Sequence, residues 1–280
     1  MTWMNLPQEY RTGKFRILPI EYEGEVSFGT GASKGPGEII KASKQLEYYD
    51  CEFDCEPFEK GIELLESVKG DSFEEVSEKI NNKIKIDDGR FTIFLGGDHS
   101  ITISTVKALE KVHEDFSVIV FDAHPDIFHS WNGSENNHRC VSARVSNNHE
   151  VALLGIRSMD KDEKEIIEKN ENVHLISSYD FSLNKLKEIL PKLRRKVYIS
   201  IDVDVFDFIR NTGTPEPGGM RWQEVIDTLK LIFSQKEVIA ADIVEFAPQE
   251  NYRVEAYSLA KLVYKLVALK YINPFKCANI

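Results

Sequence analysis

Three side chains that can bind metal ions stand at every second position of one short segment, at Asp122, His124 and Asp126. In an extended backbone, residues two apart point to the same side and lie roughly 6.6 Å from one another. The apolar run directly before them, residues 118–121, is typical of a strand buried on both faces of a sheet. Carboxylates and imidazoles that converge there can hold a divalent cation. Alternatively, the strand simply ends in a polar turn, with Asp122 or Asp126 capping the next segment of the chain.

Two further predicted strands also end in metal-binding side chains. His99 follows residues 91–95, and Asp202 and Asp204 follow residues 197–201. The carboxyl ends of parallel strands share one edge of a sheet, so we expect all six side chains to meet. Four carboxylates and two neutral imidazoles carry a charge that two divalent ions balance, whereas one ion would leave costly buried negative charge. This ligand set suits manganese best, although zinc, cobalt or nickel could also bind.

Predicted strands and helices alternate along the whole chain. This pattern favours a single three-layer α/β/α domain over residues 1–280, built around a mostly parallel sheet. Pro19 should place the first strand at a sheet edge or restrict its pairing to the first half. A glycine-rich loop, Ser27–Gly37, can pass close to a ligand. The predicted strands are residues 15–21, 91–95, 118–121, 151–156, 173–177, 197–201 and 238–244, and the predicted helices are residues 37–49, 71–86, 101–111, 139–145, one from about 160, 183–193, 223–233 and 252–269.

The composition of the chain indicates which classes of partner the protein can bind. The chain is 42% hydrophobic without an apolar run of membrane-spanning length, and its first residues lack the pattern of a secretion signal, so we expect a soluble protein. A formal charge of −11 argues against nucleic acid or an anionic membrane and is compatible with a cationic substrate. The four cysteines, Cys51, Cys55, Cys140 and Cys277, form no metal or disulfide pattern, and we interpret them as packing residues in a reducing cytoplasm.

Four sequence blocks together resemble the ureohydrolase superfamily, which has the arginase/deacetylase-like fold. The resemblance extends from about residue 17 to 269, and the Gly29–Pro36 loop and Leu154–Ser158 are more similar to agmatinases than to arginases. The superfamily also includes guanidinobutyrases and formimidoylglutamases. The blocks are Gly96-Gly97-Asp98-His99-Ser100, Asp122-Ala123-His124-Pro125-Asp126, Ser200-Ile201-Asp202-Val203-Asp204 and Asp242-Ile243-Val244-Glu245.

The resemblance implies two Mn²⁺ ions per subunit, with Asp122 and Asp202 bridging them. His99 and Asp126 would complete one ion's ligands, and a second pair, His124 and Asp204, the other's. A hydroxide shared by the ions would attack the carbon of a small cationic guanidino substrate and release urea and an amine.

The resemblance also implies three catalytic residues. His138 would shuttle protons, Glu245 would grip the guanidinium group, and Asp126 would help orient the hydroxide. Without the resemblance, His138 could equally cap a helix or lie on the surface, and Glu245 could be an ordinary acidic residue after a strand. The remaining histidines, His113, His129, His149 and His174, are interpreted as structural or surface residues.

Departures from the family pattern mainly affect the prediction of the substrate. Pro125 replaces a common threonine, Arg139 follows His138 where the family has a small residue, and the loop after Asp207 is shortened to Phe208–Gly213. Trp131 and its neighbour in the loop, Phe128, could line the substrate entrance or simply pack.

Agmatinase activity, giving putrescine for polyamine biosynthesis, is the predicted function, and arginase is its main rival. Ser134 and Asn136 stand where arginases bind the substrate's α-carboxylate, but Phe128 replaces an arginase asparagine. Glu135 in the same loop should repel a carboxylate and favour a distal ammonium group. The sequence is also compatible with a guanidinobutyrase, a formimidoylglutamase, a ureohydrolase-like metal-binding protein without turnover, and a dimetal phosphoesterase. The resemblance further implies a homo-oligomer, a trimer or hexamer.

Overall fold

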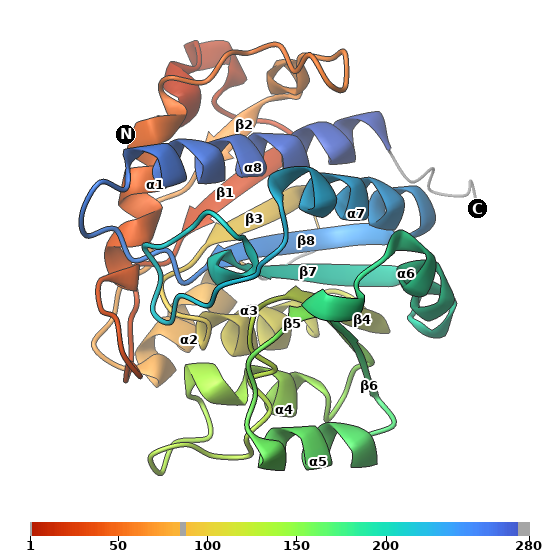
Figure 1. The fold of residues 1–280 in the computed structure, drawn as a ribbon. Coiled ribbons are helices and arrows are strands. Elements are labelled where there is room, and N and C mark those ends of the chain that lie inside the picture. The colour runs from red at the N-terminus through yellow and green to blue at the C-terminus, as the bar shows by residue number, and fades with distance from the viewer. Residues whose placement is uncertain (1, 85–87, 274–280) are drawn as a thin grey trace.

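One parallel sheet runs through the molecule, with strands in the order β2-β1-β3-β8-β7-β4-β5-β6 (Figure 1). The computed structural model describes residues 2–84 and 88–273. Every pairing between neighbouring strands of this part of the chain is parallel, which confirms the predicted α/β class. The strands are β1 (Phe15–Pro19), β2 (Ile62–Leu64), β3 (Phe91–Leu95), β4 (Phe116–Phe121), β5 (Val151–Ile156), β6 (Val173–Ser177), β7 (Lys196–Asp202) and β8 (Glu237–Val244).

Helices cover both faces of the sheet and make the three layers that the sequence predicts. The apolar side chains of α1, α6, α7 and α8 form one core with one face of the sheet, and those of α2, α3 and α4, with part of α5, pack on the other. The α-helices are α1 (Gly35–Ser43), α2 (Phe73–Lys83), α3 (Ile101–Leu109), α4 (Val141–Val145), α5 (Lys161–Lys169), α6 (Leu183–Ile189), α7 (Trp222–Gln235) and α8 (Arg253–Ile272). The 3-10 helices are η1 (Trp3–Asn5), η2 (Gln8–Tyr10), η3 (Ala32–Lys34), η4 (Pro57–Lys60), η5 (His138–Cys140), η6 (Ser178–Asp180), η7 (Leu190–Lys192) and η8 (Val203–Val205).

Strand β4 shows why the central strands are apolar throughout. Ile119 and Phe121 belong to the core on one face, Val118 and Val120 to the core on the other, and all of β4 is buried. Side chains alternate between the two faces of a strand, so a strand covered on both sides needs a continuous apolar run. Among the described helices, none has the length and apolar character needed to cross a membrane.

The short strand β2 lies beside β1, so the predicted edge position of β1 was wrong. The alternative prediction, pairing restricted to the first half of the strand, holds on the β2 side. β1 lies between β2 and β3, and only Phe15–Ile17 pair with β2, whereas Pro19 still pairs with Leu95 of β3. Pro19 is the last residue of its strand, so the N–H that it lacks removes little from the ladder. β2 itself was missed because its three residues carry too little pattern to separate them from a loop.

Some helix boundaries also differ from the prediction. α1 ends at Ser43 rather than at 49, because the buried Ser43 hydroxyl donates to the Ile40 carbonyl and accepts a hydrogen bond from the Met4 amide. Ser72 caps α2 by accepting from the Glu75 amide, and the predicted helix end at residues 85–86 lies outside the described residues.

The cysteines agree with the packing interpretation only in part. Cys140 is buried and Cys55 half-buried, but Cys51 is exposed on a turn and packs nothing, so that prediction was wrong for Cys51. Cys277 lies outside the described residues.

Candidate metal centre and substrate cavity

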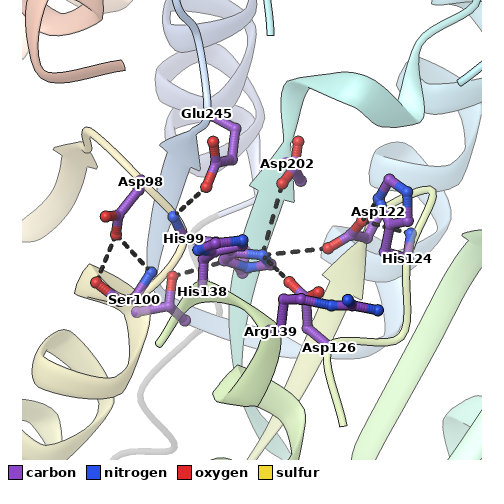
Figure 2. Close-up of polar contacts among 12 residues, drawn as sticks. Asp98, His99, Ser100, Asp122, His124, Asp126, His138, Arg139, Asp202 and Glu245 are labelled. Carbon is purple, nitrogen blue, oxygen red and sulfur yellow. Dashed lines mark hydrogen bonds and ion pairs between the residues drawn. The ribbon is translucent and has the colours of Figure 1, made fainter. Parts of the chain in front are cut away.

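Neighbouring strands of the sheet bring the predicted metal-binding side chains to one edge. His99, Asp122, the Asp202–Asp204 segment and Glu245 follow or end β3, β4, β7 and β8, which are adjacent in the sheet. Figure 2 shows the side chains of His99, Asp122, Asp202 and Glu245 gathered beyond the carboxyl ends of these strands. The shared edge is the position at which open α/β sheets bind ligands.

A first group of possible metal ligands consists of His99, Asp122 and Asp126, all buried. Nδ1 of His99 lies 3.1 Å from Oδ2 of Asp122 and 3.1 Å from Oδ2 of Asp126. Asp126 reaches this position with a left-handed backbone, φ 47°. Such a conformation is uncommon outside glycine and is concentrated at functional sites.

A second group shares Asp122 with the first and adds His124 and Asp204. Nδ1 of His124 lies 3.0 Å from Oδ2 of Asp204 and 3.7 Å from Oδ1 of Asp122. The two oxygens of Asp122 therefore face different histidines, which is the geometry that a carboxylate bridging two ions requires. Asp202 lies beside the first group, with Oδ2 at 3.6 Å from Nδ1 of His99.

The protonation of these groups fits a site built for cations. Burial and the charges of Asp204 and Asp122 hold the pKa of Asp202 well above its usual value. Burial alone would lower the pKa of His124, but hydrogen bonds and charges from Asp122 and Asp204 raise it to about 11. Oδ2 of Asp122 is buried and, apart from its 3.1 Å approach to Nδ1 of His99, accepts no hydrogen bond within the described part of the chain, which is costly for a carboxylate. Divalent ions would compensate this negative charge, so the donor set fits the metal centre that the family resemblance implies.

Gly97 couples the positions of His99 and Glu245. Its carbonyl accepts from the Glu245 amide at 2.7 Å, and a Cβ at Gly97 would lie 1.6 Å from the Tyr22 carbonyl oxygen, so only glycine fits. Oε1 of Glu245 accepts from the His99 amide at 2.7 Å, and Glu245 adopts a left-handed backbone, φ 66°. Its carboxylate is thereby turned back over the metal-binding residues (Figure 2).

A buried polar network supports His99 from behind, and its role was not predicted from the sequence. Nε2 of His99 lies 3.0 Å from Oγ of Ser200. Thr102 lies 3.4 Å from the same hydroxyl and donates to Asp242 at 2.7 Å, and Tyr198 donates to Asp242 at 2.5 Å. Partners of this kind fix the ring orientation and tautomer of a metal-binding histidine. A polar residue inside an otherwise apolar strand was the available signal for Ser200 and Asp242.

A cavity of about 220 Å³ opens beside these groups. His138 lies on its wall, with Nε2 at 2.8 Å from Oγ of Ser27, so the glycine-rich loop does approach the site. No signal in the sequence pointed to Ser27 itself. The lining residues are Val26, Ser27, Gly29, Asp98, His124, Asp126, His138, Arg139, Ser158, Asp202, Asp204, Thr212, Gly213, Thr214, Glu216 and Glu245.

The segment between Asp126 and His138 contributes less to this cavity than the sequence suggested. Ser134, Glu135 and Asn136 are not among the lining residues. Oγ of Ser134 accepts from the Asn136 amide, and Glu135 pairs with Arg144 at 2.7 Å on the surface. The expected role of Glu135 beside the substrate was therefore wrong, because Arg144 draws its carboxylate away.

Arg139 does not present a free cation to the cavity. Its guanidinium lies 3.9 Å from the ring centroid of Trp131 and 4.9 Å from that of Phe128. It also contacts Asp160 at 3.1 Å. Phe128 and Trp131 thus pack around Arg139 and are absent from the cavity lining, so they are packing residues rather than entrance residues.

Comparison with known proteins agrees with this geometry. The model of the Arginase family matches residues 13–268. The chain belongs to the arginase family. It is 34% identical over 272 residues to the N(1)-aminopropylagmatine ureohydrolase of Thermus thermophilus, covering 93% of this chain and 92% of that protein. It is 33% identical over 279 residues to an agmatinase of Pyrococcus horikoshii, covering 95% of both.

A solved structure supports the same assignment. The agmatine ureohydrolase of Thermoplasma volcanium superposes with a TM-score of 0.86 at 26% identity, covering 98% of this chain and 97% of that one. This arginase-family chain is therefore an agmatinase-like ureohydrolase, a hydrolase that acts on the C–N bonds of guanidino compounds.

Proposed function

We propose that this ureohydrolase hydrolyses agmatine to putrescine and urea at a site that holds two Mn²⁺ ions. The observation that carries the proposal is the pair of ligand groups sharing Asp122 beside a cavity rich in carboxylates. His99 and Asp126 would complete one ion's ligands, and His124 with Asp204 the other's, while Asp202 would bridge together with Asp122. Bound there, the two ions would supply an activated water at neutral pH.

Two residues of the cavity are proposed to handle the substrate and its protons. Glu245, turned toward the cavity by its left-handed backbone, would accept hydrogen bonds from the guanidinium group. His138, held by Ser27, would deliver a proton to the departing amine. The Asp126 carboxylate would also accept a hydrogen bond from the activated water and orient it.

Agmatine is favoured over arginine because the cavity offers no free cation to an α-carboxylate. Arg139 is the only lysine or arginine among the described lining residues, and its charge is taken up by Asp160 and two aromatic rings. Ser134 and Asn136 do not reach the cavity either. A second candidate substrate is N(1)-aminopropylagmatine, the compound named for the Thermus thermophilus relative, which carries one cation more than agmatine.

The cellular setting is proposed from the family resemblance. The enzyme would act in the cytoplasm as a homo-oligomer, a trimer or hexamer, and would supply putrescine to polyamine biosynthesis. Size-exclusion chromatography with light scattering tests the oligomer.

Urea release by the Mn²⁺-loaded enzyme tests the substrate. Agmatine, N(1)-aminopropylagmatine, arginine and 4-guanidinobutyrate are compared at equal concentration by the urea that they release. Formiminoglutamate is followed by formamide release, and a generic phosphoester, followed by phosphate release, checks for metal hydrolase activity of another class. We expect the highest kcat/KM with agmatine. A large preference for arginine would contradict the proposal, and absence of product from every compound would indicate a metal-binding protein without turnover.

A further inference from the structure

The cavity is lined by more negative charge than two metal ions and one guanidinium group account for. Three of the lining carboxylates, Asp126, Asp202 and Asp204, belong to the proposed metal centre, and Glu245 is assigned to the guanidinium. Two acidic residues remain, Asp98 and Glu216. Asp98 is buried and fully engaged, because its carboxylate accepts from the Gly24 amide and from the amide and hydroxyl of Ser100. Glu216 is therefore the carboxylate that has no assigned partner.

The side chain of Glu216 is available to a ligand. It is 30% exposed on the cavity wall, and within residues 2–84 and 88–273 its carboxylate accepts no hydrogen bond. Nε2 of His124 lies 3.9 Å from Oε1 of Glu216, beyond hydrogen-bonding distance. The atom of His124 that faces the other proposed metal ligands, Asp122 and Asp204, is Nδ1. Glu216 thus stands on the cavity side of His124, outside the metal centre.

Arg157 holds the backbone of Glu216 in this place. Its guanidinium donates to the carbonyls of Glu216 at 2.7 Å, Pro217 at 2.9 Å and Asp204 at 2.5 Å. These three bonds tie the loop that carries Glu216 to the segment that carries Asp204. A carboxylate on a fixed backbone loses less conformational freedom when it binds a ligand, so it is suited to recognition.

Glu245 and Glu216 line the same cavity, and the loop that carries Glu216 passes beside Glu245. A Cβ at Gly213 would lie 2.9 Å from Oε2 of Glu245, so the loop passes directly beside the guanidinium-binding carboxylate. Glu216 comes three residues later, so its Cα lies at most about 11 Å from that of Gly213. From its guanidinium carbon to its ammonium nitrogen, extended agmatine spans roughly 7–8 Å by the same bond dimensions. Because both carboxylates line one cavity, we expect one substrate molecule to contact both.

We infer that Glu216 binds the distal ammonium group of the substrate and selects guanidino compounds that carry a second cation. The inference rests on the proposed function, because it assumes that Glu245 receives the guanidinium. Charge repulsion from Glu216 would at the same time exclude substrates with a distal carboxylate and no amine, such as 4-guanidinobutyrate.

The test compares two substrates that differ only in the distal ammonium group, agmatine and n-butylguanidine. kcat/KM is measured by urea release with Mn²⁺-loaded wild type, Glu216→Gln and the control Glu135→Gln, whose carboxylate lies outside the cavity. We expect Glu216→Gln to lose about 10- to 100-fold with agmatine, the range of a hydrogen bond to a charged group, and little with n-butylguanidine. Glu135→Gln should match wild type with both.

Metal content, measured on the same samples, separates the inference from a structural role. Glu216→Gln should retain the metal content of wild type. An equal loss with both substrates, or a loss of metal, would overturn the inference and make Glu216 a residue that positions His124. Urea release from neither substrate by wild type would overturn the proposed function and the inference with it.

Discussion

The imidazole of His138 and the hydroxyl of Ser27 are joined across the cavity mouth, with Nε2 at 2.8 Å from Oγ. Ser27 belongs to the loop before η3, 111 positions away in the sequence, and both residues line the cavity. A hydrogen bond at one ring nitrogen of a histidine determines which tautomer the ring adopts.

His138→Ala should retain metal and lose turnover. A positioned acid or base contributes typically about 10²–10⁴-fold, so we expect kcat for urea release to fall by that factor. Ser27→Ala keeps the imidazole but removes its contact with the Ser27 hydroxyl, so we expect a smaller loss of kcat. Full activity in His138→Ala would remove this residue from the proton path.

Glu245→Gln tests the guanidinium contact. The amide keeps the shape of the side chain and its acceptor for the His99 amide, but it loses the charge that attracts the substrate. We expect kcat/KM to fall with both KM and kcat affected, while metal content stays that of wild type. Gly213→Ala is a matched variant that leaves the charge in place but crowds Oε2, and it should raise KM. Unchanged kinetics in both variants would place the substrate elsewhere.

Metal binding should strengthen as pH rises. Without metal, burial disfavours the protonated form of His124, but the carboxylates of Asp122 and Asp204 favour it. Together they raise the pKa of His124 to about 11. A metal ligand must be the neutral imidazole, so binding releases the proton across the whole range between about pH 6 and 9. Each released proton increases the apparent association constant by about tenfold per pH unit. Calorimetry in buffers of different ionisation enthalpy counts the protons, and a pH-independent affinity would contradict this prediction.

Lys265 forms a buried ion pair far from the site, and we expect its replacement to lower the stability of the fold. Nζ of Lys265 in α8 lies 2.7 Å from Oδ1 of Asp50 and 2.8 Å from Oε2 of Glu52, and Asp50 is fully buried. Lys265→Met leaves that carboxylate without its cation, so we expect the free energy of unfolding to fall by about 3–5 kcal/mol.

The control for this prediction is Lys41→Met on α1. Lys41 is 58% exposed and pairs with Glu38 of its own helix, so its loss should change the free energy of unfolding by less than about 1 kcal/mol. Urea unfolding of both variants in the same metal state makes the comparison. Equal stabilities of the two variants would show that the Lys265 pair contributes no more than a surface pair.

Sequence alone predicted the sheet and the meeting of six side chains because both depend on local patterns. A strand covered on two faces must be apolar, and parallel strands must end at one edge, so His99, Asp122 and Asp202 could be brought together without a structure. β2 was not predicted because its three residues are too few to show the alternating hydrophobic pattern of a strand. The end of α1 depended on a contact between Ser43 and Met4, which are distant in sequence.

The parts of the site that were not predicted depend on long-range contacts between ordinary residue types. Ser27, Ser200 and Glu216 have no spacing that marks them, and each acquires its position through a segment far away in the sequence. The expectation for Glu135 failed for the same reason. Its partner Arg144 lies on the next helix and holds the Glu135 carboxylate in an ion pair outside the cavity.

The most direct test of the shared metal centre is the number of metal ions that Asp122→Asn binds. Elemental analysis after Mn²⁺ loading compares this variant with wild type and with His124→Ala. Among the described residues, Asp122 belongs to both ligand groups, whereas His124 belongs to one of them. We predict about two ions per chain in wild type, about one in His124→Ala and almost none in Asp122→Asn. Two ions retained in Asp122→Asn would contradict the bridging role of this aspartate and the binuclear centre built on it.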